Sequence, residues 1–162
     1  MHQQIVNGAL ALIYRAAHAL RGMLWHIARP SLLGVRALVV RDDQVLLVRH
    51  RGGATPWGLP GGAINPYERL EEAARREVYE ESGVPAEFQR VLGVYDAFHF
   101  NYVNYIIVFV FTAQGEPGAS SSIEIAEARF FPLSDLPDGI DPGSRRRIDE
   151  YLAGATGISA LW

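Results

Sequence analysis

The sequence contains no cysteine and no lysine among its 162 residues. Without cysteine the chain can form neither disulfide bonds nor thiolate metal sites, a composition typical of the reducing cytoplasm, where we expect the protein to work. Without lysine, a lysine nucleophile and a P-loop lysine are excluded, and all fifteen basic residues are arginine. Charged contacts to a phosphate ligand are therefore expected from arginine, whose planar guanidinium binds phosphate through two parallel hydrogen bonds.

Long apolar runs are absent as well. No stretch of 18 uncharged apolar residues occurs, so the sequence predicts no transmembrane span. With 49% hydrophobic residues, the chain is typical of one globular domain with its own core. Its net charge of −3 is unevenly distributed, because residues 1–36 hold four arginines and no acid, whereas the remainder holds eleven arginines and eighteen acids. This acidic body argues against binding of duplex nucleic acid.

Residues 4–29 are expected to form one helix, or a helix broken at Gly22, and we divide the chain into an amphipathic extension (1–30) and a main domain (31–162). Three functions for the extension stay open. It packs on the domain, it forms a contact between two copies of the chain, or it lies on a membrane surface, because it is basic, aromatic and amphipathic. The apolar face would consist of Ile5, Leu12, Ala16, Leu20, Leu24 and Ile27.

The main domain alternates apolar runs with turn residues. Residues 34–40 and 45–48 predict a hairpin across Asp42-Asp43, and residues 88–97, 105–113 and 123–132 predict three further strands. Their continuous apolar character favours strands that are covered on both faces. Asp141-Pro142 predicts the start of a closing helix that reaches about residue 153, with Ile148 and Leu152 facing inward.

A glycine-rich loop and a charged helix lie at the centre of the chain. Residues 57–62, W-G-L-P-G-G, contain three glycines, which permit turns that other side chains would forbid. The helix is expected to begin between residues 67 and 69, and Gly83 is expected to end it. Leu70, Ala74 and Val78 recur every four residues and predict a narrow apolar face.

Three carboxylates share one face of this helix. Glu77, Glu80 and Glu81 repel one another at this spacing, and they stand at the negative end of the helix dipole. A solvated acidic face interleaved with arginines is the simpler interpretation. A divalent cation is the functional one, because Mg²⁺ binds carboxylate oxygens and keeps positions open for water and phosphate.

The spacing of the whole segment distinguishes the two interpretations. Gly62, Glu68 and the run from Arg76 to Val84 match the pattern G-x5-E-x7-R-E-U-x-E-E-x-G-U, in which U is aliphatic, at all nine constrained positions. The chain therefore resembles a Nudix hydrolase. The resemblance implies an α/β/α sandwich with a mixed sheet. It also implies hydrolysis, dependent on Mg²⁺ or Mn²⁺, of a pyrophosphate bond in a nucleoside diphosphate linked to a variable group X.

Two rival classes are less consistent with the sequence. A non-catalytic Nudix-fold module that senses a nucleotide usually has a damaged motif, whereas every carboxylate is present here. An isomerase of prenyl diphosphates would use a cysteine, which this chain lacks.

The resemblance also assigns roles within the motif. Glu80 and Glu81 are the first expected metal ligands, and Glu77 is a further ligand or the general base. Arg76 is expected to hold these glutamates in place, and Glu68 to pair with an arginine or join the outer metal shell. The carbonyl of Gly61 could complete the coordination.

Outside the motif, a glutamate near residues 123–132 sometimes supplies a further ligand or a base in this family. Glu127 is the candidate, with Glu124 behind it. Substrate contacts are expected from a group of residues around the loop and from an aromatic turn at 98–104: Arg49, His50, Arg51, Gly62, Phe100 and Tyr102. A proline sixteen residues after the motif would indicate ADP-ribose, but Phe100 stands there. A tyrosine eighteen residues after it, Tyr102, points instead to dinucleoside polyphosphates. Nucleotide sugars, oxidised or other nucleoside triphosphates and capped RNA ends stay open as substrates.

Overall fold

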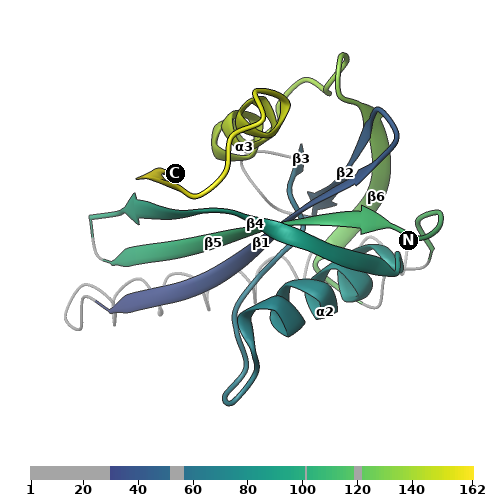
Figure 1. Cartoon of the computed structure of the whole chain (residues 1–162). Helices are drawn as coiled ribbons and strands as arrows, with labels where there is room; N and C mark the ends of the chain where they lie inside the picture. Colours follow the sequence, from purple (N-terminus) through teal and green to yellow (C-terminus); the bar gives the residue numbers. More distant parts are fainter. Residues whose placement is uncertain (1–29, 52–56, 101, 119–121) are drawn as a thin grey trace.

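The computed structural model describes residues 30–51, 57–100, 102–118 and 122–162 (Figure 1). In this part of the chain one sheet has the strand order β3-β2-β1-β5-β4-β7, and β6 pairs with β2 outside that path. The helix predicted within residues 4–29 lies outside the described residues. The elements are β1 (Ser31–Arg41), β2 (Gln44–His50), β3 (Trp57–Gly58), α2 (Leu70–Ser82), β4 (Ala86–Phe98), β5 (Val103–Ala113), β6 (Ile125–Pro132), α3 (Pro142–Leu152) and β7 (Ile158–Leu161).

Strands β1 and β5 form the centre of the sheet. They pair in parallel from Ser31 opposite Val103 to Val40 opposite Thr112. The pairs β1–β2, β2–β6 and β4–β5 are antiparallel, and β4–β7 is parallel. The sheet is therefore mixed, as predicted. Both faces of its central strands are covered along most of their length, which explains the continuous apolar sequences there.

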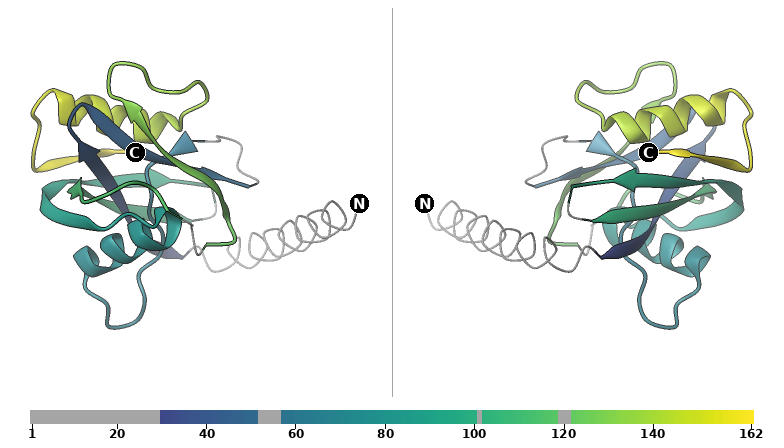
Figure 2. Two further views of the ribbon diagram at one scale, coloured as in Figure 1. Left: turned by 90° about the vertical axis from the view of Figure 1, so that its right-hand side faces the viewer. Right: turned by 90° about the vertical axis from the view of Figure 1, so that its left-hand side faces the viewer.

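Helices α2 and α3 cover opposite faces of the sheet (Figures 1 and 2). On one face, Ala73, Ala74 and Val78 of α2 join a buried cluster with Val35 and Ile107. On the other face, Ile148 of α3 belongs to a second cluster of buried residues. The predicted α/β/α sandwich is confirmed. Within the described residues, neither helix is long and apolar enough to cross a membrane.

Two predicted inward-facing leucines are exposed. Leu70 is the first residue of α2, and the buried positions of that helix begin only at Ala73. Leu152 is the last residue of α3, whose buried positions end at Ile148. In both helices the sheet therefore covers the middle turns but not the terminal leucine. The start of α3 itself agrees with the sequence, because Asp141 accepts a hydrogen bond from the Ser144 N–H at 2.7 Å, as an N-cap does.

Two strands were not predicted, and both are short. Strand β3 has only two residues, and β7 follows Gly154 and Gly157, which adopt φ values of 72° and 64°. Strand β7 brings the ring of Trp162 against Gly143, where any side chain would collide with the indole. The end of the described chain thereby packs on α3.

A buried arginine lies between α3 and β7. Arg147 is 1% exposed, and its guanidinium carbon lies 3.8 Å from the centroid of the Tyr95 ring and 5.4 Å from that of Trp162. It donates to Glu150 at 2.8 Å and to the Leu161 carbonyl at 3.3 Å. Because the Tyr95 hydroxyl also donates to Glu150 at 2.8 Å, the cluster joins α3, β4 and β7.

Candidate active site

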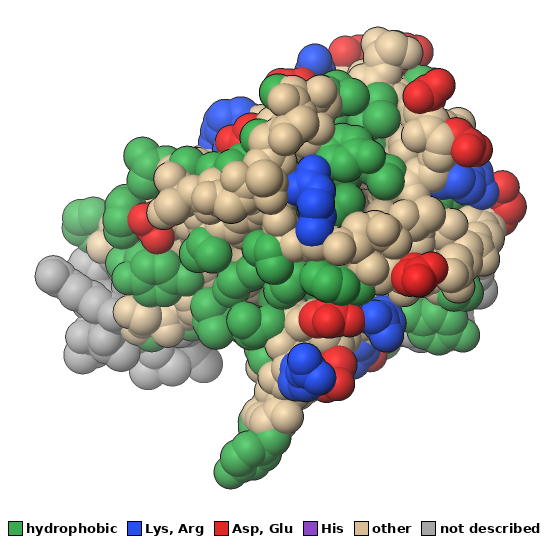
Figure 3. Space-filling view, in the orientation of Figure 1, with side chains coloured by type: hydrophobic (Ala, Val, Ile, Leu, Met, Phe, Trp, Pro, Cys, Tyr) green, Lys and Arg blue, Asp and Glu red, His purple; other side chains and the backbone are tan. Residues whose placement is uncertain are grey.

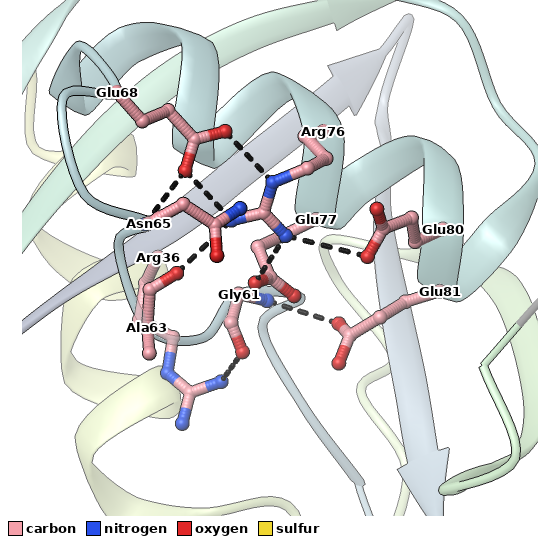
Figure 4. A network of polar contacts seen from close by, with 9 residues as sticks. All are labelled: Arg36, Gly61, Ala63, Asn65, Glu68, Arg76, Glu77, Glu80 and Glu81. Carbon is pink, nitrogen blue, oxygen red and sulfur yellow. Dashed lines mark hydrogen bonds and ion pairs between the residues drawn. The ribbon is translucent and has the colours of Figure 1, made fainter.

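The last two turns of α2 carry the charged part of the motif (Figure 4). The turn before the helix fixes Glu68, because its N–H donates to the Asn65 carbonyl at 3.1 Å and its carboxylate accepts from the Asn65 N–H at 2.9 Å. The helix ends where Gly83 adopts a φ of 70° and donates to the Tyr79 carbonyl at 2.8 Å. This left-handed residue stops α2 just after Glu81.

Arg76 is the centre of the polar network. Its Nε and Nη2 bind the two oxygens of Glu68 at 2.7 and 2.9 Å, a bidentate pair. Its Nη1 donates to Glu77 at 2.7 Å and to Glu80 at 3.3 Å, and Nη2 also reaches the Ala63 carbonyl at 3.0 Å. The repulsion among the glutamates is thus offset by one guanidinium.

The contacts between Arg76 and Glu68 shift the pKa values of both groups. The hydrogen bonds from Arg76, and then the one from the Asn65 N–H, lower the pKa of Glu68 from 4.5 to about 2. The bond to Glu68 is also the main cause that raises the pKa of Arg76. Both groups therefore stay charged over the whole physiological range.

Glu81 differs from its neighbours because it is only 5% exposed. Its carboxylate accepts the Gly61 N–H at 2.9 Å. Burial raises its pKa from 4.5 to about 7, the hydrogen bond from Gly61 and the charge of Arg36 oppose this rise, and the nearby charges of Glu77 and Glu124 add to it. A buried carboxylate among further acids gains a proton more readily than an exposed one, and a bound cation would favour its ionised form.

The glycine-rich loop lies against both α2 and β1. Gly61 has a φ of 145°, and a Cβ there would collide with the backbone of β1. A Cβ on Gly62 would come within 2.7 to 2.9 Å of the Glu77 carboxyl group. Two hydrogen bonds fix the loop on β1, from Val35 N–H to the Gly62 carbonyl at 3.0 Å and from Ala37 N–H to the Pro60 carbonyl at 2.9 Å. These glycines are needed because backbone and carboxylate approach so closely.

Arg36, on β1, was not among the predicted site residues. Its Nη1 donates to the Gly61 carbonyl at 2.6 Å and to that of Leu59 at 3.3 Å. The Gly61 carbonyl, a predicted metal ligand, is therefore bound to a guanidinium in this structure. The sequence held one signal for this residue, since Arg36 is the only charge within the apolar run 34–40.

The donor set suits a hard cation, although it is not assembled around one. Among the described residues, no three His, Asp or Glu side chains converge as a ready metal cluster. Glu77 and Glu80 are turned to Arg76, and Glu81 to the Gly61 N–H. The carboxylate oxygens of Glu77, Glu80 and Glu81 on the same helix face nevertheless fit Mg²⁺ or Mn²⁺.

The predicted residues on β2 and β6 divide between two environments. Arg49 and Glu127 are register partners and form an ion pair at 2.9 Å, with the Arg49 guanidinium 5.8 Å from the Trp57 ring centroid. His50 instead shares the surroundings of Glu81. Burial and then Arg36 lower its pKa, whereas Glu124 opposes the shift. Of the two candidate acids outside the motif, Glu124 is the one whose charge raises the pKa of Glu81, whereas Glu127 forms an ion pair with Arg49.

The remaining predicted contacts lie at the surface. Arg51 is exposed, and its N–H donates to the Glu124 carbonyl at 2.9 Å. Phe100 is exposed at the β4–β5 turn, where the Tyr102 and His99 rings stack with centroids 4.3 Å apart. Among the described residues, the structure thus brings together the glutamates of α2, Arg36 and the glycine-rich loop, with His50 and Glu124 close enough to act on them electrostatically.

The α/β/α sandwich, with a glutamate-bearing helix against a glycine-rich loop, defines the class of Nudix proteins. The family model described as NUDIX domain matches residues 30–151, and the chain therefore belongs to the Nudix family.

Named relatives agree with this assignment. A putative 8-oxo-dGTP diphosphatase of Bacillus subtilis (strain 168) is 29% identical over 126 residues, which are 78% of this chain and 83% of the relative. An ADP-ribose pyrophosphatase of Methanocaldococcus jannaschii is 31% identical over 110 residues, 65% of this chain and 64% of the relative.

Solved structures agree as well. A MutT NUDIX hydrolase from Burkholderia pseudomallei has a TM-score of 0.66 at 28% identity and covers 74% of this chain and 96% of its own. A UDP-X diphosphatase has a TM-score of 0.65 at 27% identity and covers 80% of this chain and 66% of its own. These relatives and structures, named as Nudix hydrolases, diphosphatases and pyrophosphatases, agree with the family assignment.

Proposed function

We propose that the protein hydrolyses a pyrophosphate bond in a nucleoside diphosphate linked to X, with Mg²⁺ or Mn²⁺ as its metal. The observation that carries this proposal is the buried Glu81, held beside the glycine-rich loop and among further acids. Such a site attracts a divalent cation, and a cation bound there would in turn attract the phosphates of a substrate. The named relatives are a putative 8-oxo-dGTP diphosphatase and an ADP-ribose pyrophosphatase, and both 8-oxo-dGTP and ADP-ribose contain such a bond.

The residues on α2 have separate roles in this proposal. Glu77, Glu80 and Glu81 would hold the metal, which supplies charge neutralisation and a more acidic bound water. Arg76 orients the carboxylates of Glu77 and Glu80, and Glu68 keeps Arg76 in place. Glu124 is the acid outside the motif that we propose for the site, and Glu127 moves to second place because Arg49 pairs with it.

Substrate contacts are proposed for the residues around the loop. Arg49 and Arg51 could bind phosphate, the exposed Phe100 and the half-buried Tyr102 could stack on a base, and His50 lies within the acidic surroundings of Glu81. The loop backbone at Gly62 can approach a ligand closely because it has no side chain.

The test is a panel of candidate substrates with Mg²⁺, measured by release of phosphate after coupling to a phosphatase. The panel contains ADP-ribose, dinucleoside polyphosphates, UDP-sugars, and normal and oxidised nucleoside triphosphates. We expect one class to turn over well and Glu81→Gln to lower kcat on the order of 10³-fold.

The matched control is Glu71→Gln on the same helix, because Glu71 is bound only to the partly exposed Arg75. It should leave kcat unchanged. Equal losses in both variants would contradict the proposed role of Glu81, and metal-independent turnover would contradict the proposed cofactor.

A further inference from the structure

The face of the sheet that α2 covers extends beyond the helix. Residues directly opposite in a strand pair point to the same face, so Val35, Ile107 and Val94 form one row across β1, β5 and β4. Val35 and Ile107 belong to the cluster under α2. The left-hand ends of β1, β4 and β5 in Figure 1 continue past that helix.

The following row is apolar and exposed. Leu33 of β1 lies opposite Tyr105 of β5, which lies opposite Asp96 of β4, which lies opposite Leu161 of β7. Phe98 lies two residues further along β4, on the same face. We call five residues the open sheet face, and their exposed fractions are Leu33 49%, Val94 44%, Phe98 66%, Tyr105 37% and Leu161 64%.

This cluster is continuous rather than scattered. Hydrophobic side chains gather over these strand ends in the space-filling view (Figure 3). Contiguous apolar surface of this kind, drawn from four neighbouring strands, marks an interaction site in a soluble domain, whereas single exposed apolar residues need no explanation. Asp96 is the only charge within the row Leu33–Tyr105–Asp96–Leu161.

The chain enters the sheet at the rim of this surface. Ser31 is the first residue of β1, and it lies opposite Val103, whose N–H donates to the Pro30 carbonyl at 3.2 Å. Two residues later the strand reaches Leu33 of the open sheet face. The 29 residues that precede Pro30 in the sequence are therefore tethered directly beside the exposed apolar row.

The composition of that segment complements the surface. Residues 1–29 contain three arginines and no acid, whereas residues 30–162 contain twelve arginines and eighteen acids. A helix over residues 5–27 would be about 35 Å long and about 10 Å wide. Four neighbouring strands span about 14 Å between the first and the last. One such helix is thus long enough to cross the whole open sheet face.

We propose that residues 5–27 dock on the open sheet face of the same chain, with their apolar stripe on the strands and their arginines toward the acidic domain. Arg15 or Arg21 would lie near Asp96. A second copy of the chain and an anionic membrane are the competing occupants. The tether favours the chain's own segment, because a short linker raises its effective concentration at the surface to the millimolar range.

The absence of cysteine allows a direct test on the full chain. Tyr105→Cys is combined in turn with cysteine at position 12, 16, 20 or 24, and the variants are oxidised at about 1 µM with diamide. Arg146→Cys replaces Tyr105→Cys in the matched control, because Arg146 is exposed on α3 at the opposite face. We expect at least one pair with Tyr105→Cys to form an intramolecular disulfide at tenfold or greater yield than any control pair.

A second measurement uses tryptic cleavage after Arg15 and Arg21. Tyr105→Asp places a charge on the open sheet face and should speed this cleavage several-fold. Thr112→Asp is the control, because Thr112 is exposed on the same strand but lies opposite Val40, which belongs to the cluster on the α3 face. Unchanged cleavage in Tyr105→Asp would overturn the proposal.

The disulfide experiment separates the competing occupants. Disulfide-linked dimers in place of internal bonds, with a dimer in sedimentation velocity, would assign the surface to a second copy. Flotation with vesicles that contain phosphatidylglycerol but not with phosphatidylcholine alone, without an internal disulfide, would assign the segment to a membrane. Either result would overturn the proposal. None of these readouts depends on catalysis, so the inference stands or falls separately from the proposed function.

Discussion

Two arginines on opposite faces of the sheet organise their surroundings in different ways. Arg76 on α2 is partly accessible and binds three carboxylates of the motif. Arg147 on α3 is almost completely buried, and aromatic rings and a single carboxylate surround it. The first arginine holds the acids for which we propose a role in metal binding, whereas the second joins β7 and Trp162 to the core. The same type of side chain thus orders a cluster of acids on one face and stabilises the packing of buried rings on the other.

The largest expected effect is on stability and belongs to Arg147. Arg147→Met should lower the free energy of unfolding by about 3 kcal/mol, because it removes a buried guanidinium that donates to the partly buried Glu150 and to the Leu161 carbonyl. Urea denaturation measures this change. Arg146→Met, at an exposed position next to it, should change little. The kcat of folded Arg147→Met should equal that of the parent, and a large loss of kcat would remove the distinction between the two arginines.

The next effect is on catalysis and belongs to Arg76. Arg76→Gln should lower kcat/KM on the order of 10²-fold, because Glu77 and Glu80 lose the group that orients them. Steady-state kinetics on the best substrate of the panel measures the loss. Arg75→Gln is the matched control, since Arg75 binds only Glu71 at the surface of α2. A loss of similar size in both variants would show that general charge, not the network, matters.

The smallest expected effect is the pH dependence of the stability that the Glu68–Arg76 ion pair contributes. The pKa of Glu68 is about 2 in the folded protein and lies below its ordinary value of 4.5, so folding favours the ionised form. The stabilisation is complete above pH 4.5 and is lost as the pH falls toward 2. The difference in unfolding free energy between the parent and Glu68→Gln should therefore shrink over this range.

Urea denaturation at several pH values measures that difference, with Glu71→Gln as a control for general electrostatics. If the difference between the parent and Glu68→Gln stayed constant from about pH 5 to about pH 2, Arg76 would not be the partner that holds Glu68 ionised.

Local patterns in the sequence predicted most of the fold. The central strands, the hairpin and the limits of α2 follow from apolar runs, turn residues and Gly83, all of which act over a few residues. Strand β7 could not be found in this way, because its four residues depend on pairing with β4, more than sixty positions earlier. Arg147 could not be recognised either, since its burial requires rings from β4 and from Trp162.

The sequence could predict those parts of the candidate site whose arrangement depends only on residue spacing along one helix. Glu77, Glu80 and Glu81 share a face because of the helical repeat alone. The choice between Glu124 and Glu127 depends on the register of β6 against β2, which places Glu127 beside Arg49. Arg36 approaches Gly61 from a strand 25 positions away. Neither fact is encoded in a local pattern.

The parallel pairing of β1 with β5 has a consequence for the nascent chain during synthesis. Each residue of β1 pairs with a residue that is synthesised 72 positions later, as Ser31 pairs with Val103. At about 5–20 residues per second, the ribosome needs roughly 4 to 14 seconds to deliver that partner. During this interval β2 can close one side of β1 by the hairpin, but the other side is open. The centre of the sheet is therefore assembled late, and the rate of folding is governed by closure of this long loop rather than by α2.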